Sequence, residues 1–222
     1  QTCALPISDR RCLTPEICPA LPVDHDQHLN LLRRVRQLDG VKKVFVASGL
    51  RYDLILDDEA AGERYLDELV AHHVSGQLKV APEHSEDRVL IAMGKPDTKS
   101  LVEFRKRFRK ATEDAGLPQF LTYYLIAAHP GCTERDMAEL RKFATEELKV
   151  RPEQVQIFTP TPSTYAGVMY YTEMDPFTGE RLFVEKDPRR KQRQKALVTE
   201  SSRPSSSKRR PRSSRRRSQR RK

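Results

Sequence analysis

Helical and strand-like hydrophobic patterns alternate along residues 27–175 of this chain. Apolar side chains recur at helical spacing in four segments, 28–38, 63–73, 100–115 and 133–148. Short apolar runs lie between or after them, at 41–48, 77–82, 120–128 and 154–159, and predict buried strands. The strand starts are 36, 43 and 34 residues apart, which is the size of a βαβ unit. The pattern therefore predicts an α/β fold with a parallel sheet and external helices.

Two of the helices carry capping signals. Ser100 and Glu103 suit a capping box, with Gly116 as the stop. Thr133, with Asp136 three residues later, predicts the start of the fourth helix.

The number of repeats sets the architecture. Right-handed crossovers allow a barrel or an open doubly wound sheet. A full eight-fold barrel needs about 200 residues or more, whereas residues 27–175 supply four βα units. We expect a partial parallel (β/α) barrel, either a small open sheet or part of a larger barrel. Because the chain has no initiating Met, we also expect it to be a fragment.

The rest of the chain divides by composition. Four prolines between positions 6 and 22 predict an irregular leader over 1–26. Residues 176–200 are polar and charged, which predicts an extension with a loop and a short helix. Ser, Arg and Lys fill 19 of the 22 positions from 201 to 222, so we expect a disordered tail.

The positive charge is concentrated in that tail. The chain has a net charge of +10, but residues 201–222 hold eleven Lys or Arg and no acid, so residues 1–200 have a net charge of −1. We therefore expect any nucleic-acid contact to be weak and to go through 201–222. No run reaches the ~18 apolar residues of a membrane span. Four Cys, no Trp and no visible signal peptide predict a reducing, cytoplasmic compartment and no membrane partner.

Polar residues or glycines follow every predicted strand. Ligands bind at the carboxyl ends of parallel strands, so these residues are candidates for one binding rim. They are Ser48, Gly49 and Arg51 after the first strand, Glu83, His84 and Ser85 after the second, His129, Pro130 and Gly131 after the third, and Thr159 in the fourth. The alternative is ordinary turn chemistry, which favours the same residue types.

Metal ligation is the less favoured use of these residues. Glu83, His84 and His129 have side chains that suit Zn or Fe, but neighbouring Glu and His on one loop rarely reach one metal. We therefore assign no metal ligand. Cys132 precedes a helix whose dipole can lower a thiol pKa, yet no base is evident, so we expect a packed cysteine. We also expect His72 at the surface and His73 in packing.

The strand-end blocks are similar to a known family. RRCLTPEICP, VKKVFVASGLRYDL, LKVAPEHSEDRVLIAMGKP, YYLIAAHPGCTERDM and VQIFTPTPST resemble successive blocks of the YgiQ family of radical S-adenosylmethionine proteins, over about residues 10–198. The resemblance implies a partial parallel barrel that binds a 4Fe–4S cluster and S-adenosylmethionine. Reductive cleavage of that cofactor gives a 5′-deoxyadenosyl radical.

The resemblance also implies roles for the rim. Ser48 and Arg51 would contact the ribose and the carboxylate of S-adenosylmethionine, because Arg binds carboxylates through its fork. Glu83, His84 and Ser85 would face cofactor or substrate. The turn at 129–131 would pack near the adenine, and Thr159 would begin the Pro-rich turn. The three-Cys motif C-x₃-C-x₂-C of the family does not occur in this chain, so we expect the cluster ligands upstream and the chain alone to be inactive. Substrate and catalytic residues stay unassigned.

Two other functions remain open. One is an unrelated α/β isomerase or hydrolase that uses Glu83, His84 and His129 as acid–base groups. The other is a non-catalytic RNA-associated module that acts through the tail, although the tail has no aromatic residues for stacking.

Overall fold

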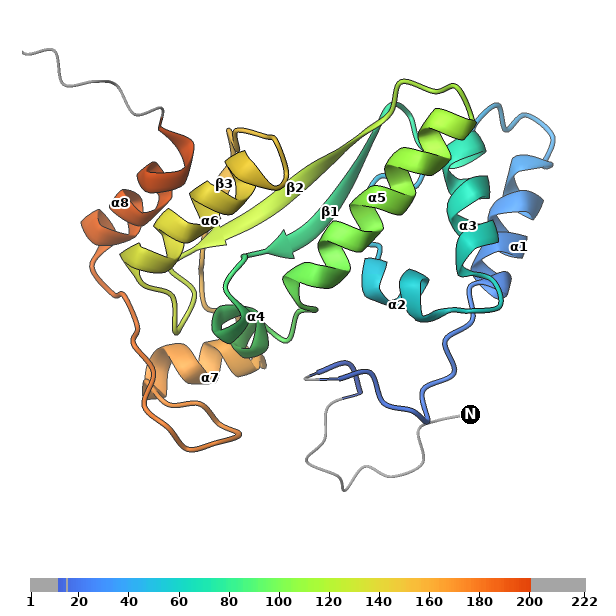
Figure 1. The fold of residues 1–222 in the computed structure, drawn as a ribbon. Coiled ribbons are helices and arrows are strands. Elements are labelled where there is room, and N and C mark those ends of the chain that lie inside the picture. Colours follow the sequence, from blue (N-terminus) through green and yellow to red (C-terminus); the bar gives the residue numbers. More distant parts are fainter. Residues whose placement is uncertain (1–11, 15, 201–222) are drawn as a thin grey trace, which may run out of the picture.

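The core of the protein is a three-stranded parallel sheet. A computed structural model describes residues 12–14 and 16–200, in which β1 (Gln77–Glu83), β2 (Phe120–Ala127) and β3 (Val155–Ile157) pair in the order β1-β2-β3. The helices α4 (Asp87–Met93) and α5 (Thr98–Asp114) lie between β1 and β2 in the chain, and α6 (Glu134–Glu146) lies between β2 and β3 (Figure 1). The predicted α/β class and partial parallel βα arrangement are confirmed.

The remaining helices flank this sheet at its two ends. Before it come α1 (Asp26–Arg36), α2 (Tyr52–Asp57) and α3 (Gly62–Glu68), which continues into a π-helical turn, η1 (Leu69–His73). After it come α7 (Tyr165–Thr172) and α8 (Pro188–Thr199), and α8 packs against α6 and β3 (Figure 1). Among the described residues, no helix combines the length and the apolar composition of a membrane span.

One of the four predicted strands does not form. Residues 41–48 have no strand assignment, and their backbone bonds to η1 instead of to the sheet. The Val46 N–H donates to the His73 carbonyl at 2.8 Å, and His73 Nδ1 donates to the Val44 carbonyl at 2.8 Å. Because these polar groups are used there, the segment does not extend the β-ladder. His73 is fully buried, as predicted for a packing residue, and His72 is exposed.

The helix caps agree with the sequence in one case of two. Thr133 and Asp136 form the reciprocal capping box of α6. The predicted cap at Ser100 is wrong. Asp97 caps α5, and its carboxylate accepts from the Ser100 N–H at 2.9 Å and from the Ser100 hydroxyl at 2.7 Å. Asp is as good an N-cap as Ser, so α5 begins two residues earlier than expected.

Two groups of buried apolar side chains fix the helices to the sheet. One joins α1, α2, α3, α5 and β1 around Tyr65 and Phe104, which are both 0% exposed. The other joins β2, β3, α6 and α8 and includes Met137, Leu140 and Val198. The residues after the sheet are therefore part of the folded core as far as α8.

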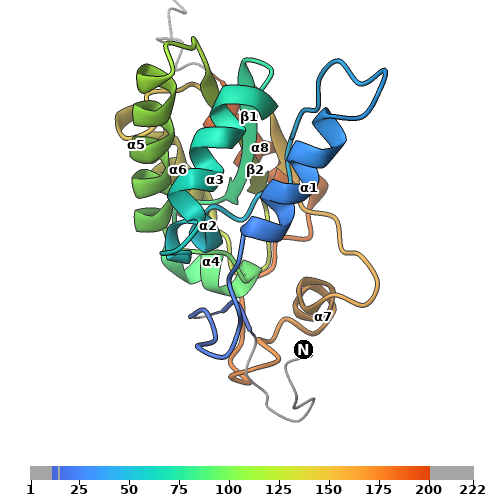
Figure 2. The same cartoon turned by 90° about the vertical axis from the view of Figure 1, so that its right-hand side faces the viewer.

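The two faces of the sheet differ in burial. Leu78 and Val80 of β1 are buried, whereas Lys79, between them, is exposed. On β2, Phe120 is 57% exposed and Tyr124 is 40% exposed. Successive side chains of a strand point to opposite faces, so one face packs on helices and the other is open. Figure 2 shows α5 and α6 on the packed side.

This difference predicts unequal effects for two phenylalanines. Phe104→Ala should lower the free energy of unfolding by about 3–5 kcal/mol, because it leaves a cavity in the core. Phe120→Ala should change it by less than about 0.5 kcal/mol, because that ring is more than half exposed. Urea denaturation followed by circular dichroism measures both. Equal losses would contradict the open face.

Candidate functional site

The carboxyl end of β1 is distorted at Glu83. The pairing of β1 with β2 shifts between Val80 and Glu83, and Glu83 has φ 67°, a left-handed value that is costly for a residue with a Cβ. The Glu83 carboxylate forms an ion pair with Lys95 at 2.7 Å. The distortion turns the chain so that the next residues, His84 and Ser85, are buried at the strand end.

The end of β2 is distorted in the same way. Ala128 follows the strand with φ 58° and is fully buried. A left-handed conformation in a non-glycine residue costs about 1–3 kcal/mol and is concentrated at functional sites. Adjacent parallel strands thus end in strained residues at one edge of the sheet. This supports the prediction that these ends form a site.

His84 is a neutral imidazole with a defined tautomer. Its side chain is 1% exposed, and burial lowers its pKa to about 4. Nδ1 accepts a hydrogen bond from the Glu86 N–H at 3.0 Å, so the ring proton lies on Nε2. Nε2 is 3.4 Å from the Sγ of Cys132 and donates toward it. A histidine in this tautomer has no free lone pair with which to deprotonate the thiol.

Cys132 is a buried thiol. It is fully buried, as expected for a packed cysteine, and burial raises its pKa to about 12, so a dipole-lowered value is wrong here. Its Sγ lies 3.7 Å from both the Thr133 carbonyl and the Gln194 Oε1, which can accept the S–H proton. No base is evident near this cysteine from the sequence, because His84 is 48 residues away in the chain. The contact with His84 holds the ends of β1 and β2 together and does not activate a nucleophile.

His129 has the opposite tautomer. Its Nδ1 donates to the Pro130 carbonyl at 2.8 Å, which leaves the lone pair on Nε2. Burial lowers its pKa to about 4. Its ring meets Phe158, the residue after β3, edge to face at 4.9 Å. His129 therefore joins the ends of β2 and β3.

The turn after His129 is held from two sides. The Gly131 N–H donates to the Phe183 carbonyl at 2.7 Å, and the Gly131 carbonyl accepts from Arg88 Nη1 at 2.6 Å. Arg88 also pairs with Asp136, the capping residue of α6. With φ 87°, Gly131 occupies a conformation that favours glycine. The predicted turn at 129–131 is thus fixed by α4 and by the segment before α8.

Ser85 differs from these residues because its polar atom has no protein partner. It is 9% exposed, and among the described residues nothing hydrogen-bonds its buried Oγ. A buried hydroxyl without a partner costs about 1–3 kcal/mol. Such an atom at a strand end suits a ligand that would satisfy it.

The first and last predicted loops lie differently. Arg51 directs its guanidinium to Asp53, through Nε–Oδ1 at 2.9 Å and Nη2–Oδ2 at 2.6 Å. Ser48 and Gly49 are exposed after the segment that does not form a strand. Thr159, two residues beyond β3, is also exposed. The structure therefore brings together the candidate residues that follow β1 and β2, around His84 and His129, and leaves those at 48–51 and at Thr159 apart from them.

Gln194, which is fully buried on α8, is a residue of the site that is not predicted from the sequence. Its Oε1 accepts from the Ala128 N–H at 3.0 Å, and its Nε2 donates to the Cys132 carbonyl at 3.4 Å. A polar residue in a strongly basic helix gave no sign of this role. The one available signal was the helical spacing of Gln194 with Val198, which also lies on the buried side.

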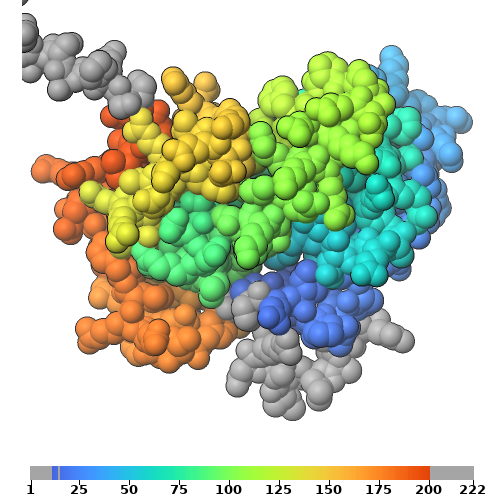
Figure 3. All heavy atoms as spheres, viewed as in Figure 1, coloured from blue at the N-terminus to red at the C-terminus, as the bar shows by residue number. Residues whose placement is uncertain are grey.

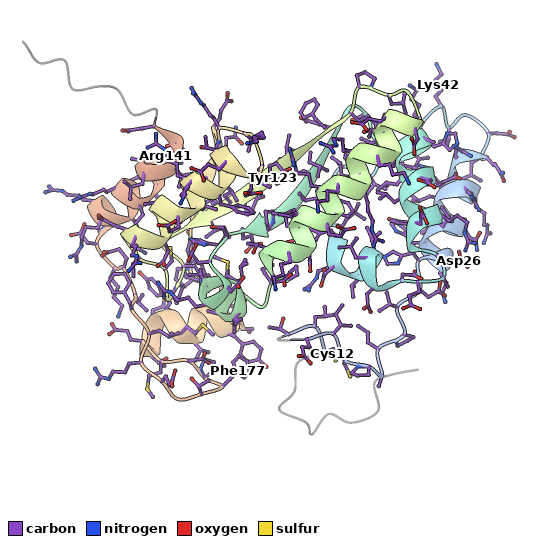
Figure 4. The ribbon with its side chains drawn as sticks, viewed as in Figure 1. Cys12, Asp26, Lys42, Tyr123, Arg141 and Phe177 are labelled. Atoms are coloured by element: carbon purple, nitrogen blue, oxygen red, sulfur yellow. The ribbon has the colours of Figure 1, made fainter. Side chains whose placement is uncertain are left out.

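The described residues do not offer a metal centre. No group of three or more His, Cys, Asp or Glu in the described part of the chain is placed to hold a metal ion. Cys12 and Cys18 are free, and Cys12 lies in the N-terminal segment below α2 in Figure 4. A surface depression of about 550 Å³ beside α1 and α3 is lined mostly by charged residues such as Arg33 and Glu63, away from the strand ends.

We expect Gln194→Ala to destabilise the protein by about 1–3 kcal/mol, because the buried Ala128 N–H would lose its acceptor. Gln192→Ala, on the exposed side of the same helix, is the matched control and should have almost no effect. Chemical denaturation of both variants tests this. If the two variants have the same free energy of unfolding, Gln194 does not stabilise the end of β2.

The two buried histidines predict acid sensitivity. Each has a folded pKa of about 4 against 6.5 for a free histidine, so the unfolded state binds more protons between these values. The free energy of unfolding should therefore fall as the pH drops from 6.5 to 4, by up to about 1.4 kcal/mol per pH unit for each histidine. His84→Gln should halve this slope, and His72→Gln, at an exposed site, should leave it intact. Denaturation at several pH values between 4 and 6.5 measures this slope. An unchanged pH dependence of stability in His84→Gln would refute the lowered pKa of His84.

Most of the chain is similar in sequence to known proteins. It is 56% identical over 192 residues to a UPF0313 protein of Fusobacterium nucleatum. The aligned region covers 86% of this chain and 34% of that protein. The identity to a UPF0313 protein of Clostridium perfringens is 49%, over 85% of this chain and 28% of that protein. The identity to one of Methanosarcina acetivorans is 46%, over 86% of this chain and 25% of that protein.

A model described as a domain of unknown function, DUF3362, matches residues 153–219. The chain spans about a third or less of the length of these curated relatives. These relatives are named UPF0313 proteins, and they are similar to this chain over most of its length.

Proposed function

We propose that this chain is part of the (β/α) core of a radical S-adenosylmethionine enzyme and that it binds the cofactor at the carboxyl ends of β1 and β2. The observation that carries the proposal is the pair of strained strand ends, Glu83 and Ala128, which gather His84, Ser85 and His129 at one edge of the sheet. These residues belong to the blocks that resemble the YgiQ family. Ligand sites of parallel α/β folds lie at this edge.

The open face of the sheet also supports this reading. Lys79, Phe120 and Tyr124 are exposed on the face opposite to α5 and α6. In a closed (β/α) barrel, that face is the interior and is covered by the other strands. The remaining strands would come from the rest of the whole protein.

The rim residues fit parts of S-adenosylmethionine. The unpartnered Ser85 hydroxyl can bond a ribose hydroxyl, and Glu83 can accept from an ammonium group that replaces Lys95. Arg51 can bind the carboxylate of S-adenosylmethionine only if its guanidinium group releases Asp53. The cofactor, when bound beside a reduced cluster, supplies the radical, and these residues bind and orient it.

The described residues do not fit the 4Fe–4S cluster itself. Such clusters are held by Cys thiolates, and the buried thiol of Cys132 has a pKa raised to about 12 by burial. Together with the missing three-Cys motif, this leads us to place the cluster ligands outside this chain. No step of the reaction is assigned to it.

The geometry favours this proposal over an acid–base isomerase or hydrolase. A general base needs a free lone pair directed at the substrate. His84 uses its Nδ1 lone pair on the Glu86 N–H, and Glu83 is paired with Lys95. Two of the three groups that such an enzyme would use are therefore occupied.

The test is S-adenosylmethionine binding in the reconstituted whole protein, measured by calorimetry. Glu83→Gln and Arg51→Lys should each weaken binding about ten- to a hundredfold, because a hydrogen bond to a charged group is worth about 1.5–3 kcal/mol. Ser85→Ala should weaken it about tenfold or less, as for a neutral hydrogen bond. His72→Ala, on an exposed helical site, is the control.

Cleavage of the cofactor by the reduced protein gives a second readout. Wild-type binding and cleavage in all three rim variants would remove the proposed site. Failure of the whole protein to bind the cofactor would remove the proposed function.

A further inference from the structure

The candidate residues at the strand ends are buried from solvent. His129 and Ser85 are 3% and 9% exposed, and Gly131, in the turn after β2, is buried as well. The Ser85 hydroxyl has no partner among the described residues. A ligand that bonds these groups can reach them only after a covering segment has moved. Entry of a ligand therefore requires a movable segment at this edge of the sheet.

Residues 173–187, which connect α7 to α8, lie against the turn after β2 and are called the hairpin below. The Phe183 carbonyl accepts from the buried Gly131 N–H at 2.7 Å. A side chain on Gly131 would meet the Leu182 side chain at 4.0 Å. Figure 3 shows α7 and the hairpin (orange) at the lower edge of the molecule. The hairpin thus covers one of the buried turns from outside.

The hairpin is bonded mainly to itself. Met174 and Arg181 form an isolated antiparallel bridge, and the Leu182 N–H donates to the Glu173 carbonyl at 2.8 Å. In this segment, which the structure describes in full, Glu185 alone is buried. Segments with few buried side chains open at low cost. The hairpin can therefore move as one unit while the core stays folded.

The two ends of the hairpin are suited to act as hinges, because hinges are commonly found at the ends of helices. Helix α7 ends at Thr172, and Glu173 follows with φ 56°, a left-handed value. Helix α8 begins at Pro188, after Asp187. Between these ends, Glu173 and Lys186 form an ion pair in which both side chains are about half exposed. An exposed ion pair is weak, so the base of the hairpin is loosely closed.

The tip of the hairpin rests on α7. The Phe177 ring, labelled in Figure 4, lies 4.6 Å from the Tyr165 ring. Both residues are exposed, so this aromatic contact is not part of the buried core. An opening motion would break this contact and the hydrogen bond to Gly131.

We propose that the hairpin is a flap that opens to admit the ligand of the strand-end site and closes on the turn at 129–131. The identity of the ligand rests on the proposed function, in which it is S-adenosylmethionine. The opening motion rests on the hairpin itself, with its bond to the buried Gly131 N–H and its exposed ion pair. Closure would exclude water from the bound cofactor, as mobile loops do in many enzymes.

Amide hydrogen exchange in the full chain, followed by NMR, tests the opening without a ligand. The Gly131 N–H is bonded to the hairpin and the Ala128 N–H to Gln194, and both residues are buried. The protection factor of Gly131 should be at least about tenfold lower than that of Ala128, because an open flap exposes only the first.

Two matched variants assign this exchange to the hairpin. Lys186→Ala should lower the protection of Gly131 about twofold or more, because it removes the ion pair at the base. Lys106→Ala, which removes an exposed ion pair on α5, should leave it unchanged. Equal protection of Gly131 and Ala128 in the wild type would overturn the proposal, since Gly131 would then exchange only when the core unfolds.

Limited trypsin digestion of the reconstituted whole protein tests the response to the ligand. Arg181 in the hairpin and Lys149 in the loop after α6 are both exposed cleavage sites. S-adenosylmethionine should slow cleavage after Arg181 about fivefold or more, because it stabilises the closed flap, and should not affect cleavage after Lys149.

The two proposals fail in different ways. Cofactor binding without protection of Arg181 would overturn the flap and leave the cofactor site in place. Absence of cofactor binding would remove the proposed function, and the exchange at Gly131 would then decide by itself whether the hairpin opens.

Discussion

The hydrogen bond from the buried Ala128 N–H to the Gln194 side chain holds the sheet to the last helix. A left-handed residue at the end of β2 leaves its N–H in the core, where an unpaired donor is costly. Gln194 accepts from it and donates to the Cys132 carbonyl. Through this one amide, α8 pairs two buried backbone groups of the turn after β2.

The same region explains why a histidine and a cysteine in contact need not be reactive. His84 accepts from a backbone N–H and therefore presents a proton, not a lone pair, to Cys132. Burial raises the pKa of that thiol and lowers the pKa of the imidazole, so both are neutral. Their contact is structural, and it connects loops that belong to different strands.

The molecule thus has two different surfaces. The strand ends gather the buried side chains of His84, Ser85 and His129 next to two strained residues, Glu83 and Ala128. The flank of α7 and α8 is exposed, basic and aromatic. The strand ends are the basis of the proposed enzyme function, and α8 contributes to them through the buried side chain of Gln194.

The α/β class, three of the strands, most long helices and the Thr133 cap can all be predicted from the sequence, because periodicity and caps are local properties. It also marked His84, Ser85 and His129 by their place after strands. It could not tell that residues 41–48 bond to His73 instead of joining the sheet, since strand pairing is non-local. The contact of His84 with Cys132 and the role of Gln194 join residues that are 48 and 66 positions apart, so they follow from the folded arrangement and not from local sequence.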